Sequence, residues 1–242
     1  MTEPVRWGVL GCARVFERRM VPGFRAAADS AQLLAVASRS DEKAREVAAK
    51  HGIARAYGSY KSLLADPDIE AVYIPLPNDL HCAWTLRALA AGKHVLCEKP
   101  MATNSKDAEA MIKACADAKK LLMIGCRAQY EPYNLRAIEM CRTGKLGRIV
   151  SVTSDHGRTA NPAEKRDRWH LKKALSGGGS LPNIGIYSLC RKRTSSRFNW
   201  IISRSVFAPA SPPKTPGEEG LHDVRYIEAI CRAVKEGIPV KS

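Results

Sequence analysis

Short apolar runs alternate with stretches of helical period through the first half of this 242-residue chain. The apolar runs lie at Val5–Gly11, Leu33–Ala37, Ala71–Pro75, His94–Cys97 and Leu121–Gly125. Helices are expected between them at Met20–Ala28, Asp41–His51, Leu80–Ala91 and Ser105–Lys119. Runs this short, separated by helices, are typical of parallel strands that are buried on both faces. A helical bundle would not need β-rich runs such as Ala-Val-Tyr-Ile. The pattern therefore predicts an α/β fold, a doubly wound parallel sheet of Rossmann type, over residues 1–125.

The alternation of apolar runs and helical stretches ends after Gly125, which predicts a second, α+β domain over residues 126–242. A helix is expected at Pro132–Thr143 and a strand with one exposed face at Ile149–Thr153. Residues 191–214 carry six basic residues and no acid, follow no clear period, and are predicted to be irregular and poorly ordered. A last helix is expected over 216–236, where Pro216 takes a position in the first turn.

Composition narrows the class of protein. The net charge of +15, from 39 basic and 24 acidic residues, suits either nucleic acid or an anionic ligand. The basic stretches lack the interleaved aromatics that single-strand binders use, so no nucleic-acid partner is expected. No apolar run reaches eighteen residues and the start shows no secretory signal, so no membrane contact is expected. The eight cysteines form no CxxC pair, which argues against a metal site and favours a reduced, cytoplasmic protein.

A glycine turn follows the first apolar run. Gly11-Cys12-Ala13-Arg14-Val15 stands where dinucleotide-binding chains carry G-x-G-x-x-G, between a strand and a helix. Ala13 in place of the second glycine still lets the backbone approach a pyrophosphate, which would face the helix N-terminus. A tight turn without a ligand would look similar, so the assignment depends on the surrounding βαβ unit.

The end of the second apolar run indicates which nucleotide is preferred. NAD sites usually place an acid there, whereas this chain has Ser38-Arg39-Ser40, with Lys43 one turn later. A guanidinium matches a 2′-phosphate, which an acid would repel. We therefore expect NADP, held by Ser38, Arg39 and Lys43. Asp41 could still bind a ribose, so NAD stays open, and a solvated Arg39 is the structural alternative.

Two later motifs resemble a known family. Pro77-Asn78-Asp79-Leu80-His81 follows the third run, and the stretch from Ala91 to Ala102 contains Glu98-Lys99-Pro100. Both resemble the Gfo/Idh/MocA oxidoreductases, whose Glu-Lys-Pro motif is their most specific marker. Stretches at 126–130, 178–187 and 216–220 are most similar to the glucose–fructose oxidoreductase branch. The resemblance implies a nicotinamide cofactor and a sugar or polyol substrate.

The resemblance also implies roles for two residues. Lys99 would lie beside the nicotinamide and the reacting hydroxyl, and Tyr187 would match the family's acid–base residue. A desolvated ammonium can orient the substrate oxygen, and a nearby phenol can exchange its proton. A surface lysine and a packed tyrosine are the alternatives. Further cofactor contacts are expected at Leu76, Pro77, Asn78, His81, Glu98, Lys99, Arg127, Trp169 and His170, and substrate contacts at Lys99, Tyr130, Asn183 and Tyr187.

Three features depart from the family pattern. Asn183 replaces an Asp, so a charge that helps hold the sugar is missing. His170 follows Trp169 where this branch usually has Arg, which weakens an expected phosphate contact. After Tyr187 the chain lacks most of the family's open sheet, because a short basic stretch leads directly to the last helix. We therefore expect residues 146–153 and the last helix to lack cover, and a homo-oligomer built through that sheet to be weakened.

Three functions stay open at this point. The first is an NADP-dependent oxidoreductase that acts on a sugar or polyol, which the phosphate-loop and Lys99 motifs favour. The second is an NADP(H)-binding protein of the same descent without turnover, which the missing sheet and Asn183 favour. The third is a basic nucleic-acid binder, which salt-dependent retention on DNA would favour.

Overall fold

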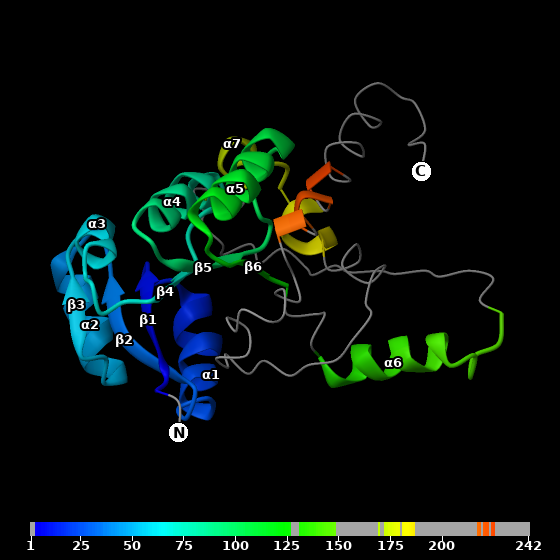
Figure 1. The fold of residues 1–242 in the computed structure, drawn as a ribbon, viewed down its shortest axis with the longest axis horizontal. Coiled ribbons are helices and arrows are strands. Elements are labelled where there is room, and N and C mark those ends of the chain that lie inside the picture. The colour runs from blue at the N-terminus through cyan, green and yellow to red at the C-terminus, as the bar shows by residue number, and fades with distance from the viewer. Residues whose placement is uncertain are drawn as a thin grey trace, which may run out of the picture.

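The computed structural model describes residues 3–126, 131–148, 169, 172–179, 181–186, 217–218, 220–222 and 224–225. Six parallel strands form one sheet in the order β3-β2-β1-β4-β5-β6 (Figure 1). Chain order runs outward from β1 in both directions, so the sheet is doubly wound as predicted. The strands are β1 (Val5–Leu10), β2 (Ala31–Ala37), β3 (Arg55–Tyr57), β4 (Ala71–Ile74), β5 (His94–Glu98) and β6 (Leu122–Gly125).

Helices cover both faces of the sheet. Successive residues of β4 point to opposite faces of the sheet, since Val72 belongs to one buried cluster and Tyr73 to the other. The first cluster contains residues of α3, α4 and α5, and the second contains residues of η1, α1 and α2. Their bounds are η1 (a π-helical turn, Phe16–Met20), α1 (Val21–Ala26), α2 (Asp41–His51), α3 (Tyr60–Leu64), α4 (Asn78–Ala90) and α5 (Ser105–Ala118).

Most of the expected elements are confirmed within a few residues. Ser40 is the N-cap of α2, and its side chain accepts a hydrogen bond from the Lys43 backbone N–H at 3.2 Å. The first helix differs from the expectation, because helical backbone begins at Arg14 and passes through η1 before α1. The strand β3 and the helix α3 were not expected at all, since three residues at a sheet edge leave no apolar run to detect.

The second half of the chain supplies three described elements, α6 (Pro132–Arg142), α7 (Lys173–Ser176) and a second π-helical turn, η4 (Leu181–Gly185). The helix α6 confirms the expected one, and Leu146 beyond it is exposed, as expected. The expected strand at 149–153 and the irregular stretch at 191–214 lie outside the described residues.

The expectation that the last helix lacks cover is wrong for its described part, residues 217–225, which are helical where described. Val224 is 3% exposed and Leu221 packs against the core cluster that contains α4 and α5. A Cβ added to Gly220 would lie 2.8 Å from the Met101 side chain. Small residues on this helix thus let it approach the Rossmann domain, which covers its described part.

Candidate active site

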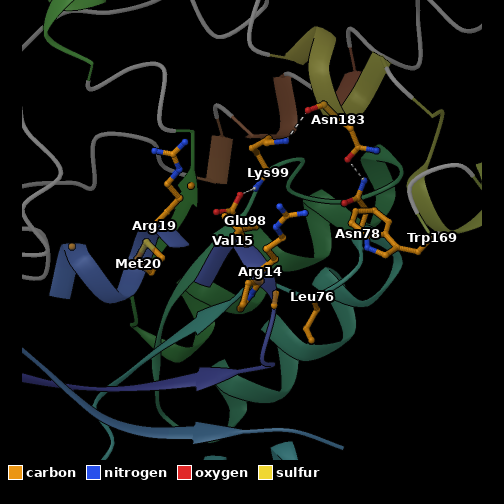
Figure 2. A pocket seen from close by; sticks show the side chains of 14 residues that line it. Arg14, Val15, Arg19, Met20, Leu76, Asn78, Glu98, Lys99, Trp169 and Asn183 are labelled. Carbon is orange, nitrogen blue, oxygen red and sulfur yellow. Dashed lines mark hydrogen bonds between the residues drawn. The ribbon is translucent and has the colours of Figure 1, made fainter. Parts of the chain in front are cut away.

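A cavity of about 550 Å³ opens at the carboxyl ends of β1, β4, β5 and β6. It lies where the strand order reverses, which is the usual ligand position in sheets of this kind. Figure 2 shows side chains around it from the first helix, from the ends of β4 and β5, and from the second half of the chain. Its lining comprises Ala13, Arg14, Val15, Arg19, Met20, Gly23, Pro75, Leu76, Asn78, Glu98, Lys99, Gly125, Trp169 and Asn183.

The glycine turn at the end of β1 fits a dinucleotide pyrophosphate. Gly11 has φ +118°, and a Cβ there would lie 2.9 Å from Leu76 Cδ2, so only glycine fits without strain. Its N–H donates to the Ala37 carbonyl at 2.9 Å, which fixes the turn against β2. The helix begins at Arg14, and Arg14 and Val15 of its first turn line the cavity. The first N–H groups of a helix have no acceptor within it and can bind an anion. This arrangement can hold a phosphate without further side chains.

The residues expected at the 2′-phosphate lie together beside this turn. Arg39 is exposed just beyond β2, and the exposed Lys43 pairs with Glu46 at 2.9 Å. The Cys12 thiol donates to the Lys43 carbonyl at 3.8 Å, which ties the turn to α2. Burial raises the pKa of the Cys12 thiol, so this group stays protonated at neutral pH. Two cations with access to solvent, one of them paired with Glu46, therefore lie beside this turn.

Lys99 is half-buried at the cavity wall, just after β5. Its ammonium donates to the backbone carbonyl of Asn183 at 2.7 Å. Its backbone N–H donates to Glu98 Oε2 at 3.2 Å, and the Tyr73 hydroxyl donates to Glu98 Oε1 at 2.8 Å. The Glu98 carboxylate therefore holds the turn from which the Lys99 side chain extends (Figure 2).

His81 lies behind the cavity wall rather than on it. Its side chain is fully buried, and its two ring nitrogens each lie 2.8 Å from a backbone carbonyl, of Leu76 and of Pro100. Burial lowers the pKa of this imidazole, which favours its neutral form. The ring links the loops that follow β4 and β5, and both loops carry residues of the cavity.

Asn78 and Asn183 join the second half of the chain to the Rossmann domain. Asn78 begins α4 and is 2% exposed, and its Nδ2 donates to the Ser176 carbonyl at 2.8 Å and to Asn183 Oδ1 at 3.3 Å. Asn183 Nδ2 donates to the Gly179 carbonyl at 2.9 Å. Positive φ angles at Gly177, Gly178 and Gly179 make the turn that brings this carbonyl into place.

The cavity brings together many of the residues expected from the sequence. Those on its wall are Ala13, Arg14, Val15, Leu76, Asn78, Glu98, Lys99, Trp169 and Asn183. Gly11, Cys12, Ser38, Arg39, Lys43, Pro77 and His81 are described but do not line it. Arg127, Tyr130, His170 and Tyr187 lie outside the described residues, so their roles stay predictions.

Sequence reasoning missed Arg19 and Gly23, which line the cavity from the first helix. With Val15 they are spaced four residues apart, so the helical period could have placed them on one face. Pro75 and Gly125 were also missed, although both stand at the carboxyl ends of strands that meet at one edge. Three cations, Arg14, Arg19 and Lys99, and one acid, Glu98, give the cavity wall a positive balance that suits a phosphate-bearing ligand.

Comparison with protein-family profiles identifies the family of the chain. A profile described as the oxidoreductase family with an NAD-binding Rossmann fold matches residues 5–126, and a Gfo/Idh/MocA C-terminal domain profile matches 134–190. The chain belongs to the Gfo/Idh/MocA family. The resemblance to this family that the sequence motifs indicated is therefore confirmed.

Several Gfo/Idh/MocA relatives are similar to this chain over most of its length. An uncharacterized oxidoreductase, ORF334, of Rhizobium meliloti is 34% identical over 95% of this chain and 64% of its own length. D-xylose 1-dehydrogenase (NADP(+)) 2 of Haloferax volcanii is 37% identical over 77% of this chain and 56% of its own. The chain thus spans only between half and two thirds of the length of these curated relatives.

A solved structure resembles the whole chain. The aldose–aldose oxidoreductase from Caulobacter crescentus, crystallised with glycerol, superposes with a TM-score of 0.84 at 29% identity. The match covers 99% of this chain and 100% of that one.

The described residues also bear on other classes of site. They contain no helix with the length and apolarity needed to cross a bilayer. They contain no group of three or more side chains suited to hold a metal ion. The six cysteines in the described ranges, Cys12, Cys82, Cys97, Cys115, Cys126 and Cys141, form no disulfide.

Proposed function

We propose that this chain is an NADP-dependent oxidoreductase that transfers a hydride between the nicotinamide and a carbinol carbon of a sugar or polyol. The observation that carries the proposal is the half-buried Lys99 ammonium on the wall of a cavity that the start of the first helix also lines. A D-xylose dehydrogenase that uses NADP(+) and an aldose–aldose oxidoreductase among the relatives support the choice of cofactor and substrate class.

In this proposal Gly11 and the backbone from Ala13 to Val15 hold the pyrophosphate, and Arg39 with Lys43 binds the 2′-phosphate. When bound, NADP supplies the two-electron redox chemistry at its nicotinamide ring. The protein supplies orientation and proton transfer, which need residues within hydrogen-bond reach of the substrate hydroxyl.

Lys99 orients the substrate oxygen and stabilises negative charge on it as its proton leaves. Tyr187 accepts that proton, although its ordinary pKa of about 10 is too high for this task at neutral pH. A nearby ammonium favours the phenolate, so Lys99 also prepares Tyr187. In this proposal Lys99 stabilises charge and Tyr187 transfers the proton.

Cofactor preference is tested by titrating the protein with NADPH and with NADH and following fluorescence. We expect tighter binding of NADPH, with Arg39→Ala weakening it by roughly 10–100-fold because a charge-assisted pair is lost. NADH affinity should change little in the same variant. The exposed Arg25 on α1 offers a matched control, Arg25→Ala, that should leave both affinities unchanged. Equal affinities for the two cofactors would contradict the assignment.

The catalytic roles are tested by kinetics with NADP and aldoses or polyols. Lys99→Ala and Tyr187→Phe should each lower turnover by ~10²–10⁴-fold while NADPH binding persists. Near-full turnover by Tyr187→Phe would show that this residue only packs. Intact NADPH binding without any turnover by the unmutated chain would instead favour the non-catalytic alternative.

A further inference from the structure

The side-chain amide of Asn183 makes two hydrogen bonds, one as an acceptor and one as a donor. Its Oδ1 accepts from Asn78 Nδ2 at 3.3 Å, and its Nδ2 donates to the Gly179 carbonyl at 2.9 Å. Turning the amide over would set Oδ1 against the Gly179 carbonyl oxygen and Nδ2 against the Asn78 amino group. Both contacts would then be repulsive, so the network assigns one orientation.

Asn78 is fixed just as firmly from the other side. It is 2% exposed, and its Nδ2 donates both to Asn183 and to the Ser176 carbonyl, the latter at 2.8 Å. The Ser176 hydroxyl in turn accepts from the Gly179 N–H at 2.8 Å. A chain of neutral groups therefore runs from α4 through the glycine turn to η4.

The end of this chain is the Lys99 ammonium. The backbone carbonyl of Asn183 accepts from Lys99 Nζ at 2.7 Å, and Figure 2 shows this bond beside the one between the two asparagines. Since the side chain of Asn183 is bonded on both sides, its carbonyl has a fixed position. Asn78 thus acts on Lys99 through Asn183, without touching it.

We propose that Asn78 and Asn183 are positioning residues whose paired side-chain amides fix the carbonyl that holds the Lys99 ammonium, and that this pairing requires an amide at position 183. The inference rests on the proposed function for its importance to turnover, but its geometry does not. It also gives Asn183, which departs from the family's Asp, a structural use. A carboxylate at 183 has no donor for the Gly179 carbonyl, so it would break the chain.

The first test measures how fast acetic anhydride acylates Lys99 in the unliganded protein, by peptide mass spectrometry. The neutral variants Asn78→Ala and Asn183→Ala should each speed the labelling by ~3–10-fold, because they remove side-chain hydrogen bonds that fix the backbone carbonyl to which the ammonium donates. Gln32→Ala, an exposed amide on β2, is the matched control and should label at the wild-type rate. Labelling of both variants at the control's rate would overturn the proposal.

The second test is a pH profile of thermal stability for Asn183→Asp. At pH 7.5 the carboxylate opposes the Gly179 carbonyl, so the melting temperature should fall clearly below that of the wild type. The Lys99 ammonium, bonded to the backbone carbonyl of residue 183, favours the ionised acid, whereas the Gly179 carbonyl favours the protonated one. Protonation restores a donor toward the Gly179 carbonyl, so the gap should narrow as the pH falls and the acid takes up its proton. Gln32→Glu should show no such narrowing.

A melting temperature of Asn183→Asp equal to that of the wild type at pH 7.5 would show that position 183 tolerates a carboxylate, and would overturn the requirement for an amide. Both tests use protein without cofactor or substrate. A failure here therefore leaves the proposed oxidoreductase activity standing, and an inactive chain leaves this inference standing.

Discussion

Gly11 combines two constraints in one residue. Its φ of +118° excludes most side chains, and the space that a Cβ would enter is occupied by Leu76 Cδ2 at 2.9 Å. Gly11→Ala should therefore destabilise the protein by about 1–3 kcal/mol and weaken NADPH binding, as measured by denaturant unfolding and fluorescence titration. Gly23→Ala is the stability control, since nothing lies within 4 Å of its added Cβ. A wild-type unfolding curve for Gly11→Ala would contradict this reading.

Single residues also show which parts of the site could be predicted from the sequence and which could not. Lys99 and the glycine turn could be identified because each belongs to a contiguous motif. The bond from Lys99 to the Asn183 carbonyl joins residues 84 positions apart, and backbone acceptors leave no trace in side-chain identity. Arg19 was missed for a different reason, because the first helix begins at Arg14 instead of Met20 and so has a longer cavity face.

Among the elements, β3 shows why an edge strand escapes a search for apolar runs. Its residues are half-buried, and polar contacts hold its end. Asp66 Oδ2 accepts from Arg55 Nη1 at 2.7 Å and from the Tyr57 hydroxyl at 2.8 Å. These bonds form only after α3 brings Asp66 back to β3. The five apolar runs, by contrast, specify their own strands, which is why the centre of the sheet could be predicted and its edge could not.

The Asp66 contacts predict an acid-sensitive contribution to stability. Burial alone would raise the pKa of this carboxyl, but the hydrogen bonds from Arg55 and Tyr57 outweigh it and hold the pKa below its ordinary value of 3.8. The unfolded state then binds more protons than the folded state between the two pKa values, so stability falls as the pH falls through that window.

Asp66→Asn should therefore cost about 1–3 kcal/mol of unfolding free energy at pH 7, because the half-buried Arg55 and Tyr57 donors lose a buried, charged acceptor. The difference from the wild type should shrink below about pH 4, where the carboxyl takes up its proton in the unfolded state before it does so in the folded state. Urea unfolding at pH 7, 4 and 3 measures it, with the exposed Asp29→Asn as control. A difference that does not change with pH would show that the charge of Asp66 contributes nothing.

At the scale of the whole molecule, the described residues between 217 and 225 pack against the Rossmann domain. These lie against α5 and β6 in Figure 1, and Arg225 Nη2 pairs with Glu109 Oε1 at 2.8 Å. Gly220→Leu should destabilise the Rossmann domain by about 1–3 kcal/mol, since its side chain would enter space filled by Met101 and Ile124. Thermal unfolding measures this, with the exposed His222→Ala as control. Unchanged stability of Gly220→Leu would mean that this contact does not contribute.

The proposed activity is the transfer of a hydride between a sugar carbon and a nicotinamide in this cavity. The most direct test incubates the unmutated chain with NADP⁺ and aldoses deuterated at C1, such as D-xylose and D-glucose, and weighs the reduced cofactor by mass spectrometry. We expect one deuterium in the NADPH that the unmutated chain forms, and none above background with the Lys99→Ala variant. NADP⁺ that binds but gains no deuterium from any aldose or polyol would contradict the claim.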